Sequence, residues 1–231
     1  MNKILAVIPA RLESKRLPKK NIQILNDKPL FVYTIDAIKK SHYVNRFVVS
    51  TEDKTIAKIA QSNGAEVLLR PEELARDESP TDDVVMNVLE QLLKKEQYVP
   101  DIIILLQPTS PLRTTEDIDA AMKIFLDSSA DSLISVTEYD HTPYWAFRIE
   151  KGFLKPEFTS GSLKRSQDLP KLYRPNGSIF IAHLQSFLKH RSFYTKQVLS
   201  FIMPRERSID IDDEFDFSIA EFLLGKSEGK N

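Results

Sequence analysis

Short, wholly apolar runs alternate with stretches in which apolar residues recur every three or four positions. The runs at 4–8 and 101–106 lack polar alternation, which is typical of strands buried on both faces of a parallel sheet. The predicted strands are 4–8, 46–50, 66–69, 101–106 and 132–137, and the predicted helices are 28–40, 54–62, 81–97 and 116–126. Strands that alternate with helices predict right-handed crossovers and an α/β domain built on a doubly wound, mostly parallel sheet.

The pattern changes after Glu138. Residues 146–150 alternate between apolar and polar, Lys151 and Gly152 suit a turn, and a return strand follows, which together predict a hairpin. The aromatic residues nearby are Tyr139, Tyr144, Trp145 and Phe158. They exceed what a two-stranded ribbon can bury alone. We therefore expect one domain over 1–231 with an inserted hairpin region at about 139–175, and then strands at 177–182 and 198–203 and helices at 184–189 and 213–224.

Composition narrows the classes of protein that fit. The 231 residues are 42% apolar and 28% charged, which is ordinary for a globular protein, and the net charge is -1. A balanced charge argues against a nucleic-acid or membrane partner, which would need a wide basic face. Cysteine is absent, which excludes disulfides and thiolate nucleophiles. The apolar run at 4–8 is too short for a signal peptide, so we expect a cytoplasmic protein.

A basic loop follows the first predicted strand. Five cations lie within ten residues, opposed only by Glu13: Arg11, Lys15, Arg16, Lys19 and Lys20. Ligands of open α/β sheets bind where such loops leave the strands, so this position favours a polyphosphate over the alternative of a solvated charge cluster. The first glycine is Gly64, which rules out a glycine-rich phosphate loop here. Any phosphate would be held by cationic side chains.

A second candidate site is the pair Asp210 and Asp212. In an extended segment, alternation puts both carboxylates on one side and Ile209 and Ile211 on the other. Two hard oxygen ligands on one rigid segment are a usual way to hold Mg²⁺ beside a phosphate. The alternative is that Asp212 only caps the last helix.

Five blocks give the chain a resemblance to a known family. They are ARLESKRLPKKN at 10–21, RPEELARD at 70–77, QPTSPLR at 107–113, RPNGSIFI at 174–181 and DID at 210–212. In this order they resemble the acylneuraminate cytidylyltransferases, the CMP-sialic acid synthetase family, over about residues 3–224. The resemblance implies a Rossmann-like nucleotidyltransferase that transfers a cytidylyl group from CTP to a nine-carbon 2-keto sugar acid, with Mg²⁺ as cofactor.

The resemblance also assigns roles to individual residues. The expected catalytic residues are Arg11, Lys20, Asp210 and Asp212, and the last two are the expected metal ligands. The expected nucleotide-binding residues are Ala10, Arg11, Ser14, Lys15, Lys20, Asn21, Ser79 and Thr81. The expected sugar-binding residues are Gln107, Arg165 and Phe180.

The sequence departs from the family pattern at three positions. Phe180 stands where the family has Tyr, Ser166 replaces the second of two arginines, and Asn87 stands where a His is common. The family dimerises through an inserted ribbon, so we expect a homodimer in which Arg165 reaches the partner's sugar site. Which nine-carbon acid is used stays open.

Other functions remain possible at this point. One is a cytidylyltransferase for the eight-carbon acid Kdo, although we expect a more acidic block there than Gln107 to Ser110. Another is a sugar-1-phosphate nucleotidylyltransferase. From a different class, a catalytically silent nucleotide-binding module is disfavoured by the presence of Lys20 and of both aspartates.

Overall fold

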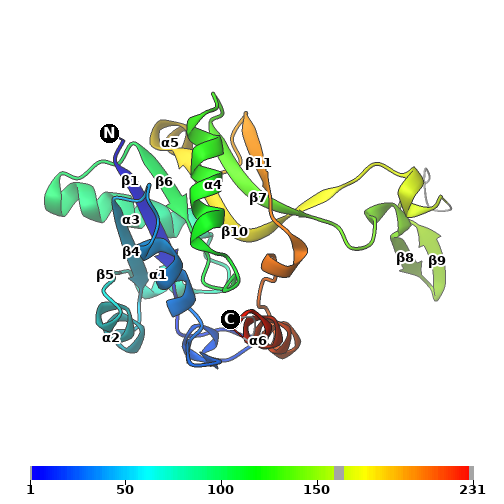
Figure 1. Ribbon diagram of the computed structural model, residues 1–231, viewed down its shortest axis with the longest axis horizontal. Helices are drawn as coiled ribbons and strands as arrows, with labels where there is room; N and C mark the ends of the chain where they lie inside the picture. Colours follow the sequence, from blue (N-terminus) through cyan, green and yellow to red (C-terminus); the bar gives the residue numbers. More distant parts are fainter. Residues whose placement is uncertain (1, 159–163, 229–231) are drawn as a thin grey trace.

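A seven-stranded sheet forms the centre of the computed structural model, which describes residues 2–158 and 164–228 (Figure 1). The strand order is β11-β7-β10-β6-β1-β4-β5. The strands are β1 Ile4–Pro9, β4 Arg46–Thr51, β5 Glu66–Leu69, β6 Ile102–Leu105, β7 Ser132–Glu138, β10 Tyr173–His183 and β11 Val198–Ile202. Strands β5, β4, β1 and β6 pair in parallel, as β11 does with β7, so the predicted mostly parallel sheet is confirmed.

Strand β10 runs antiparallel to both of its neighbours, β6 and β7. The chain leaves the body at the end of β7 and returns alongside it, with Tyr173 paired to Glu138. The segment between them is therefore a long hairpin connection, which makes an antiparallel return the direct path. The ladder is irregular between Pro175 and Phe180, where the RPNG block lies.

Helices cover both faces of the sheet. They are α1 Val32–Lys39, α2 Lys54–Ser62, α3 Thr81–Glu96, α4 Thr115–Leu126, α5 Leu184–His190 and α6 Glu214–Glu228. One core cluster joins α1, α2 and α4 to alternate residues of β1, and a second joins α3 and α5 to the others, Leu5 and Val7. A third cluster packs α6 against residues 17–30. No helix in the two described ranges has the length and apolar composition needed to cross a bilayer.

The helix predicted at 28–40 starts later than the pattern indicated. Lys28–Pro29 forms β3, which pairs with β2 (Ile24–Leu25), and α1 begins at Val32. Pro29 suits a first helical turn, but it equally suits a short edge strand. Helix α4 is capped by Thr114, whose side chain accepts a hydrogen bond from the Asp117 backbone N–H.

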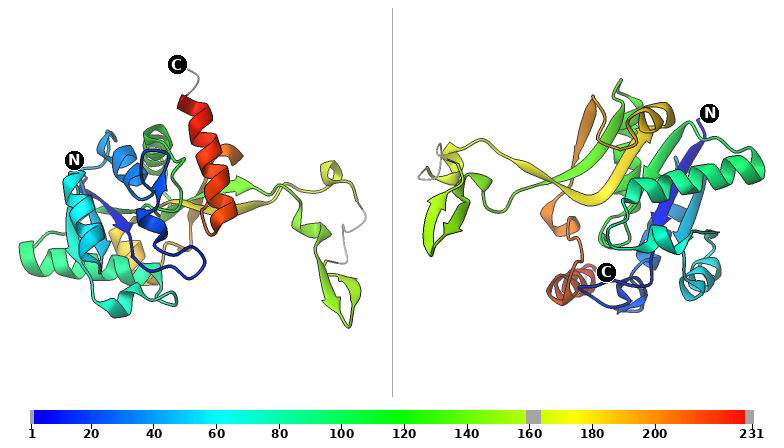
Figure 2. Two further views of the ribbon diagram at one scale, coloured as in Figure 1. Left: turned by 90° about the horizontal axis from the view of Figure 1, so that it is seen from below. Right: turned by 180° about the vertical axis from the view of Figure 1, so that it is seen from behind.

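An arm, defined as residues 139–158 and 164–172, projects away from the sheet (Figures 1 and 2). It carries the predicted hairpin, β8 Phe147–Glu150 paired with β9 Phe153–Pro156. Lys151 and Gly152 both have positive φ, +50° and +85°, as a tight two-residue hairpin turn requires. Most of the arm's large apolar side chains are exposed within this single chain.

Candidate active site

A cavity of about 240 Å³ opens at the edge of the sheet where β1, β5 and β6 end. Its walls come from the loops after these strands and from the segment that precedes α6. The predicted site residues that line it are Arg11, Ser14, Lys20, Asn21, Ser79, Thr81, Gln107, Asp210 and Asp212. Segments as distant as residues 11 and 212 thus meet at one place, as expected for the carboxyl edge of parallel strands.

Lys20 lies against the predicted metal ligands. Its Nζ donates to the Ile211 carbonyl and lies 3.6 Å from Asp212 Oδ1, and the side chain is only 11% exposed. Burial lowers the pKa of Lys20, while the negative charges of Asp212 and Asp210 oppose that shift. The inward position is set by a short 3₁₀ turn, η1 (Lys20–Ile22), which begins after Lys19 in the left-handed conformation.

Arg11 and Lys15 are both paired with carboxylates from the loop before α3. Arg11 forms an ion pair with Asp77 and donates to the Ala75 carbonyl at 3.4 Å. Lys15 lies 3.2 Å from Asp77 and 3.0 Å from Glu78. The basic loop is therefore joined by ion pairs to the loop before α3. A purely solvated charge cluster would not make these contacts.

Two residues of the basic loop have mainly structural contacts. Asn21 is buried, and its Nδ2 donates to the Arg11 carbonyl at 2.8 Å, which folds the loop back on itself. Its Oδ1 has no hydrogen-bond partner in the described part of the chain. Ala10 is fully buried, and its N–H donates to the Ser50 carbonyl, which continues the β1–β4 pairing.

Asp210 and Asp212 point to the cavity because the isoleucines beside them belong to the third core cluster. The Ile211 N–H donates to the Thr109 carbonyl at 2.8 Å, which fixes the segment against the loop after β6. Burial raises the pKa of Asp210, and a hydrogen bond from Thr109 opposes the shift. Among the described residues, Asp210 Oδ1 is buried without a hydrogen-bond partner.

The capping alternative for Asp212 is wrong. Asp213 caps α6, since its Oδ1 accepts from the N–H groups of Phe215 at 2.9 Å and Asp216 at 3.1 Å. Asp216 completes the reciprocal arrangement by accepting from the Asp213 N–H. The Asp212 carboxylate is left facing the cavity, where its ion-pair partners are Arg16 and Lys20.

The RPNG block shapes the site through its backbone. Gly177 has φ +72°, and a Cβ there would lie 2.7 Å from Gln107 Oε1 and 3.2 Å from Asp210 Oδ2. Buried Asn176 accepts from Ser135 Oγ at 2.6 Å and donates to Ser208 Oγ at 2.9 Å. The block therefore holds the segment before Asp210 close to Gln107.

Arg113 has the corresponding structural role in the QPTSPLR block. Its guanidinium is buried and donates to the carbonyls of Ser178 at 2.8 Å and Gln107 at 3.2 Å, and to Thr34 Oγ1 at 2.6 Å. Burial lowers the pKa of Arg113 to about 9, and Asp117 opposes that shift. This arginine fixes the loop after β6 and does not line the cavity.

Three charged cavity residues lie in the RPEELARD block without having been predicted. Arg70 is buried and pairs with Glu52 at 2.9 Å, and Asp77 pairs with Arg11 and Lys15. Arg76 lines the cavity and has no ion pair in the ranges that the structure describes. The signal was present, because this block follows β5 at the same sheet edge as the basic loop.

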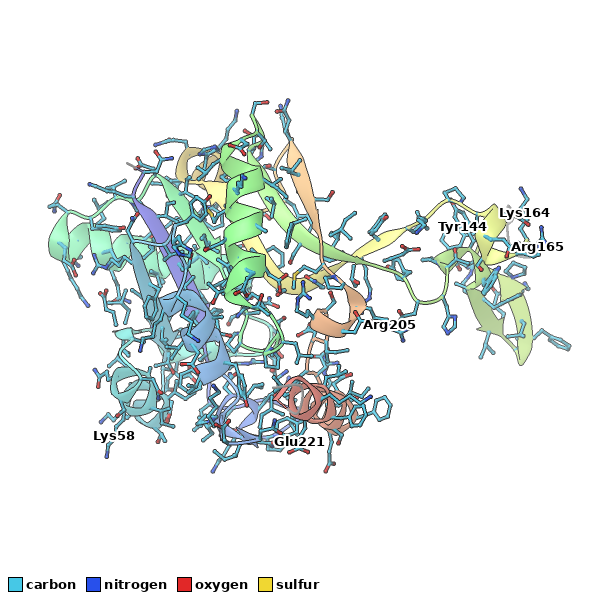
Figure 3. All side chains as sticks on the ribbon, viewed as in Figure 1. Lys58, Tyr144, Lys164, Arg165, Arg205 and Glu221 are labelled. Carbon is cyan, nitrogen blue, oxygen red and sulfur yellow. The ribbon has the colours of Figure 1, made fainter. Side chains whose placement is uncertain are left out.

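Two predicted sugar-binding residues lie away from the cavity of their own chain. Phe180 is buried in the second core cluster, with its ring centroid 5.8 Å from that of Phe193. Arg165 lies at the far end of the arm, where it pairs with Asp168 at 2.9 Å (Figure 3). Within one chain, Gln107 is the predicted sugar-binding residue that lines the cavity.

The described ranges contain no cluster of three or more His, Cys, Asp or Glu side chains that could hold a metal ion. Two carboxylates that face one cavity, with one buried oxygen left without a partner, nevertheless fit Mg²⁺. That ion commonly takes one or two protein carboxylates and completes its shell with water and substrate phosphate. Asp210 and Asp212 are the residues here that could hold it.

Comparisons with known proteins agree with this geometry. A family model described as Cytidylyltransferase matches residues 5–214. The chain is 39% identical to CMP-N,N'-diacetyllegionaminic acid synthase of Legionella pneumophila, over 96% of both chains. It is 36% identical to N-acylneuraminate cytidylyltransferase of Escherichia coli over 94% of its length, and it spans about half (51%) of that relative.

A solved structure shares the fold. The structure of CMP:2-keto-3-deoxy-manno-octonic acid synthetase complexed with CTP has a TM-score of 0.72, with 15% identity, over 97% of this chain and 99% of that one. At that identity the likeness concerns the fold alone.

Proposed function

The chain belongs to the cytidylyltransferase family, and we propose that it transfers the cytidylyl group of CTP to the anomeric hydroxyl of a nine-carbon 2-keto sugar acid. The observation that supports the proposal most strongly is the cavity itself, which gathers the basic loop, Gln107 and the Asp210–Asp212 pair. The names of the Legionella and Escherichia coli relatives support an acid sugar of this class as the acceptor.

In the proposed reaction, the anomeric oxygen attacks the α-phosphorus of CTP and forms the new P–O bond. The bond from that phosphorus to the bridging oxygen breaks, pyrophosphate leaves, and the hydroxyl proton is released to solvent. Arg11 and Lys20 offset the negative charge of the triphosphate, and Ser14, Ser79 and Thr81 offer hydroxyls at the cavity wall. Catalysis thus comes from positioning and charge, without a covalent protein nucleophile.

Asp210 and Asp212 are the residues that would hold Mg²⁺ in this proposal. When bound, the ion would add to the charge neutralisation that Arg11 and Lys20 supply to the triphosphate. Without a cation, two carboxylates aimed at an anionic ligand would repel it. Lys20, packed against Asp212, moderates that repulsion in the free protein.

We also propose that the protein is a cytoplasmic homodimer in which the arm meets a second copy. Ile149 and Phe153 are each 75% exposed within one chain, which is unfavourable for large apolar side chains on a thin ribbon. An isologous contact would cover both arms at once. Arg165, distant from the cavity of its own chain, would then serve the sugar site of the partner (Figure 3).

The proposal is tested by measuring pyrophosphate release with CTP and a panel of acceptors. The panel holds sialic, legionaminic and pseudaminic acids, Kdo, and a sugar 1-phosphate. We expect CTP-dependent release with at least one nine-carbon acid and a CMP-sugar product by mass spectrometry. Release with Kdo or the sugar 1-phosphate alone would support the corresponding alternative, and no release with any acceptor would favour a silent binding module.

A further inference from the structure

The Arg11–Asp77 ion pair forms a wall between two hollows. The inner one is the cavity described above. The outer one, about 600 Å³, lies between the basic loop, the start of α2 and the loop before α3. The residues that line both are Arg11, Ser14, Arg76 and Asp77.

The inner cavity is small for a nucleotide. Its 240 Å³ lies just below the range of about 300–1,000 Å³ typical of small-molecule sites, and an adjoining hollow of about 280 Å³ shares Arg11, Lys20 and Asp212 with it. It lies next to a larger hollow and is separated from it by side chains, of which Arg11 is 31% and Asp77 25% exposed. Because Arg11 and Asp77 line both hollows, separating this pair would widen the connection between them.

The charges around the Arg11–Asp77 ion pair indicate what kind of ligand would separate the two side chains. Asp77 accepts from Arg11, which the proposed reaction needs for the triphosphate, and from Lys15, which is an expected nucleotide-binding residue. Burial alone raises the pKa of Asp77, but the contacts with Lys15 and Arg11 outweigh it and hold this pKa below its usual range. The carboxylate is therefore ionised at neutral pH, and it engages both cations.

Arg76, next to Asp77, supplies a contact for an arriving anion. It lines both hollows and has no ion pair in the described ranges, whereas Arg11, Lys20 and Arg70 all have carboxylate partners. An anion can therefore meet a free guanidinium at the wall before any existing ion pair is broken.

We propose that Asp77 is a positioning residue that closes the nucleotide cavity by holding Arg11 and Lys15, and that a triphosphate opens it by replacing the Asp77 carboxylate on both cations. The inference rests on the proposed function for the identity of the triphosphate. Its consequence is that Asp77 competes with the nucleotide for binding and contributes nothing to the chemical step.

The test compares Asp77→Asn with Asp77→Glu and with Glu78→Gln. Glu78→Gln is the matched control because it removes the same charge one residue away. Glu78 contacts Lys15 but not Arg11. Binding of CTP and of inorganic tripolyphosphate is measured by calorimetry without sugar, together with KM for CTP and kcat. Asp77→Ser repeats the test if thermal melting shows that the Asn variant is unstable.

We expect Asp77→Asn to bind both ligands about two- to fivefold more tightly, the size of a partly exposed ion pair. KM for CTP should fall by a similar factor while kcat does not rise, since uniform binding lowers KM alone. Asp77→Glu should restore the wild-type affinity, and Glu78→Gln should have a smaller effect.

Equal or weaker binding by Asp77→Asn would overturn the inference, as would equal tightening by Glu78→Gln, which would indicate a general charge effect. Failure of the proposed function looks different. In that case the Asp77 effect on tripolyphosphate binding persists while no acceptor yields a CMP-sugar.

Discussion

The cavity edge and the arm differ in how their side chains are accommodated within one chain. Charged side chains at the cavity edge have ion-pair partners, whereas apolar side chains on the arm are exposed. At the cavity edge, three of the cations lie against carboxylates of other segments, as in Arg11–Asp77, Lys20–Asp212 and Arg70–Glu52. On the arm, Ile149 and Phe153 are each 75% exposed. Its described ion pairs with the body join Asp140 to Arg205 at 2.8 Å and Lys171 to Glu138 at 3.0 Å.

The contrast indicates two kinds of ligand. A site whose charges are balanced internally binds an ion by exchanging partners, so its occupant is a small charged molecule. A ribbon that leaves its apolar face open gains stability only by burying it against another protein surface. The predictions below test whether the two regions can be damaged independently.

The largest effect is expected at the cavity edge. Lys20→Ala should lower kcat by about 10² to 10³, as for the loss of one donor that stabilises transition-state charge. Lys19→Asn is the matched control, because it removes the neighbouring charge, and Asn tolerates the positive φ of +55° at that position. A near-normal rate of Lys20→Ala at saturating CTP would remove the basic loop from the mechanism.

A smaller effect is expected from the proposed metal ligands. Asp210→Asn should raise the Mg²⁺ concentration for half-maximal rate by at least about tenfold, the lower bound seen for outer-shell partners of metals. Asp213→Asn, which keeps a good N-cap on α6, should leave the Mg²⁺ dependence unchanged. The rate is measured as a function of Mg²⁺, and melting temperature checks folding.

If Asp210→Asn titrates with Mg²⁺ as the wild type does, the metal site lies elsewhere. The same titration of Asp212→Asn distinguishes the contribution of Asp212 to the Mg²⁺ dependence from that of Asp210. Because Asp213 is the cap, Asp212→Asn should not change the melting temperature.

The smallest effect is expected for a variant of the arm. Its molar mass in solution should be lower than that of the wild type by a factor of about two. The double variant Ile149→Ser/Phe153→Ser should convert the proposed dimer to a monomer in light scattering while CTP binding persists. Ile24→Ser, at a body position that is 57% exposed, is the control and should remain dimeric. A wild-type protein that is monomeric at micromolar concentration and fully active would contradict the dimer.

Much of the fold could be predicted because apolar periodicity reflects burial directly. Helix α2 begins and ends as predicted, since Asp53 caps it and Asn63-Gly64 ends it. Strand β5 also has the predicted bounds. Strand direction could not be predicted, because a buried strand has the same apolar pattern whichever way it runs. The antiparallel β10 follows from the arm that precedes it, which is a feature of topology.

The candidate site was predictable where ligand chemistry and sheet position coincide, as at Lys20 and Asp210. The residues that hold such side chains in place were not, because their contacts join distant segments. Arg113 belongs to a block that carries the family resemblance, yet its guanidinium donates to backbone carbonyls inside the fold. The family resemblance implied that Phe180 contacts the sugar, but its apolar ring is buried in the core.

The central claim is that one catalytic site combines the cavity of one chain with the arm of another. Mixing two inactive variants, Lys20→Ala and Arg165→Ala, tests it most directly, after brief dissociation and reassociation of the dimers. With CTP and the preferred acid sugar, pyrophosphate release should recover to about a quarter of the wild-type rate, since half of the reassembled dimers carry one intact site. A mixture that stays as inactive as its two components would contradict the account.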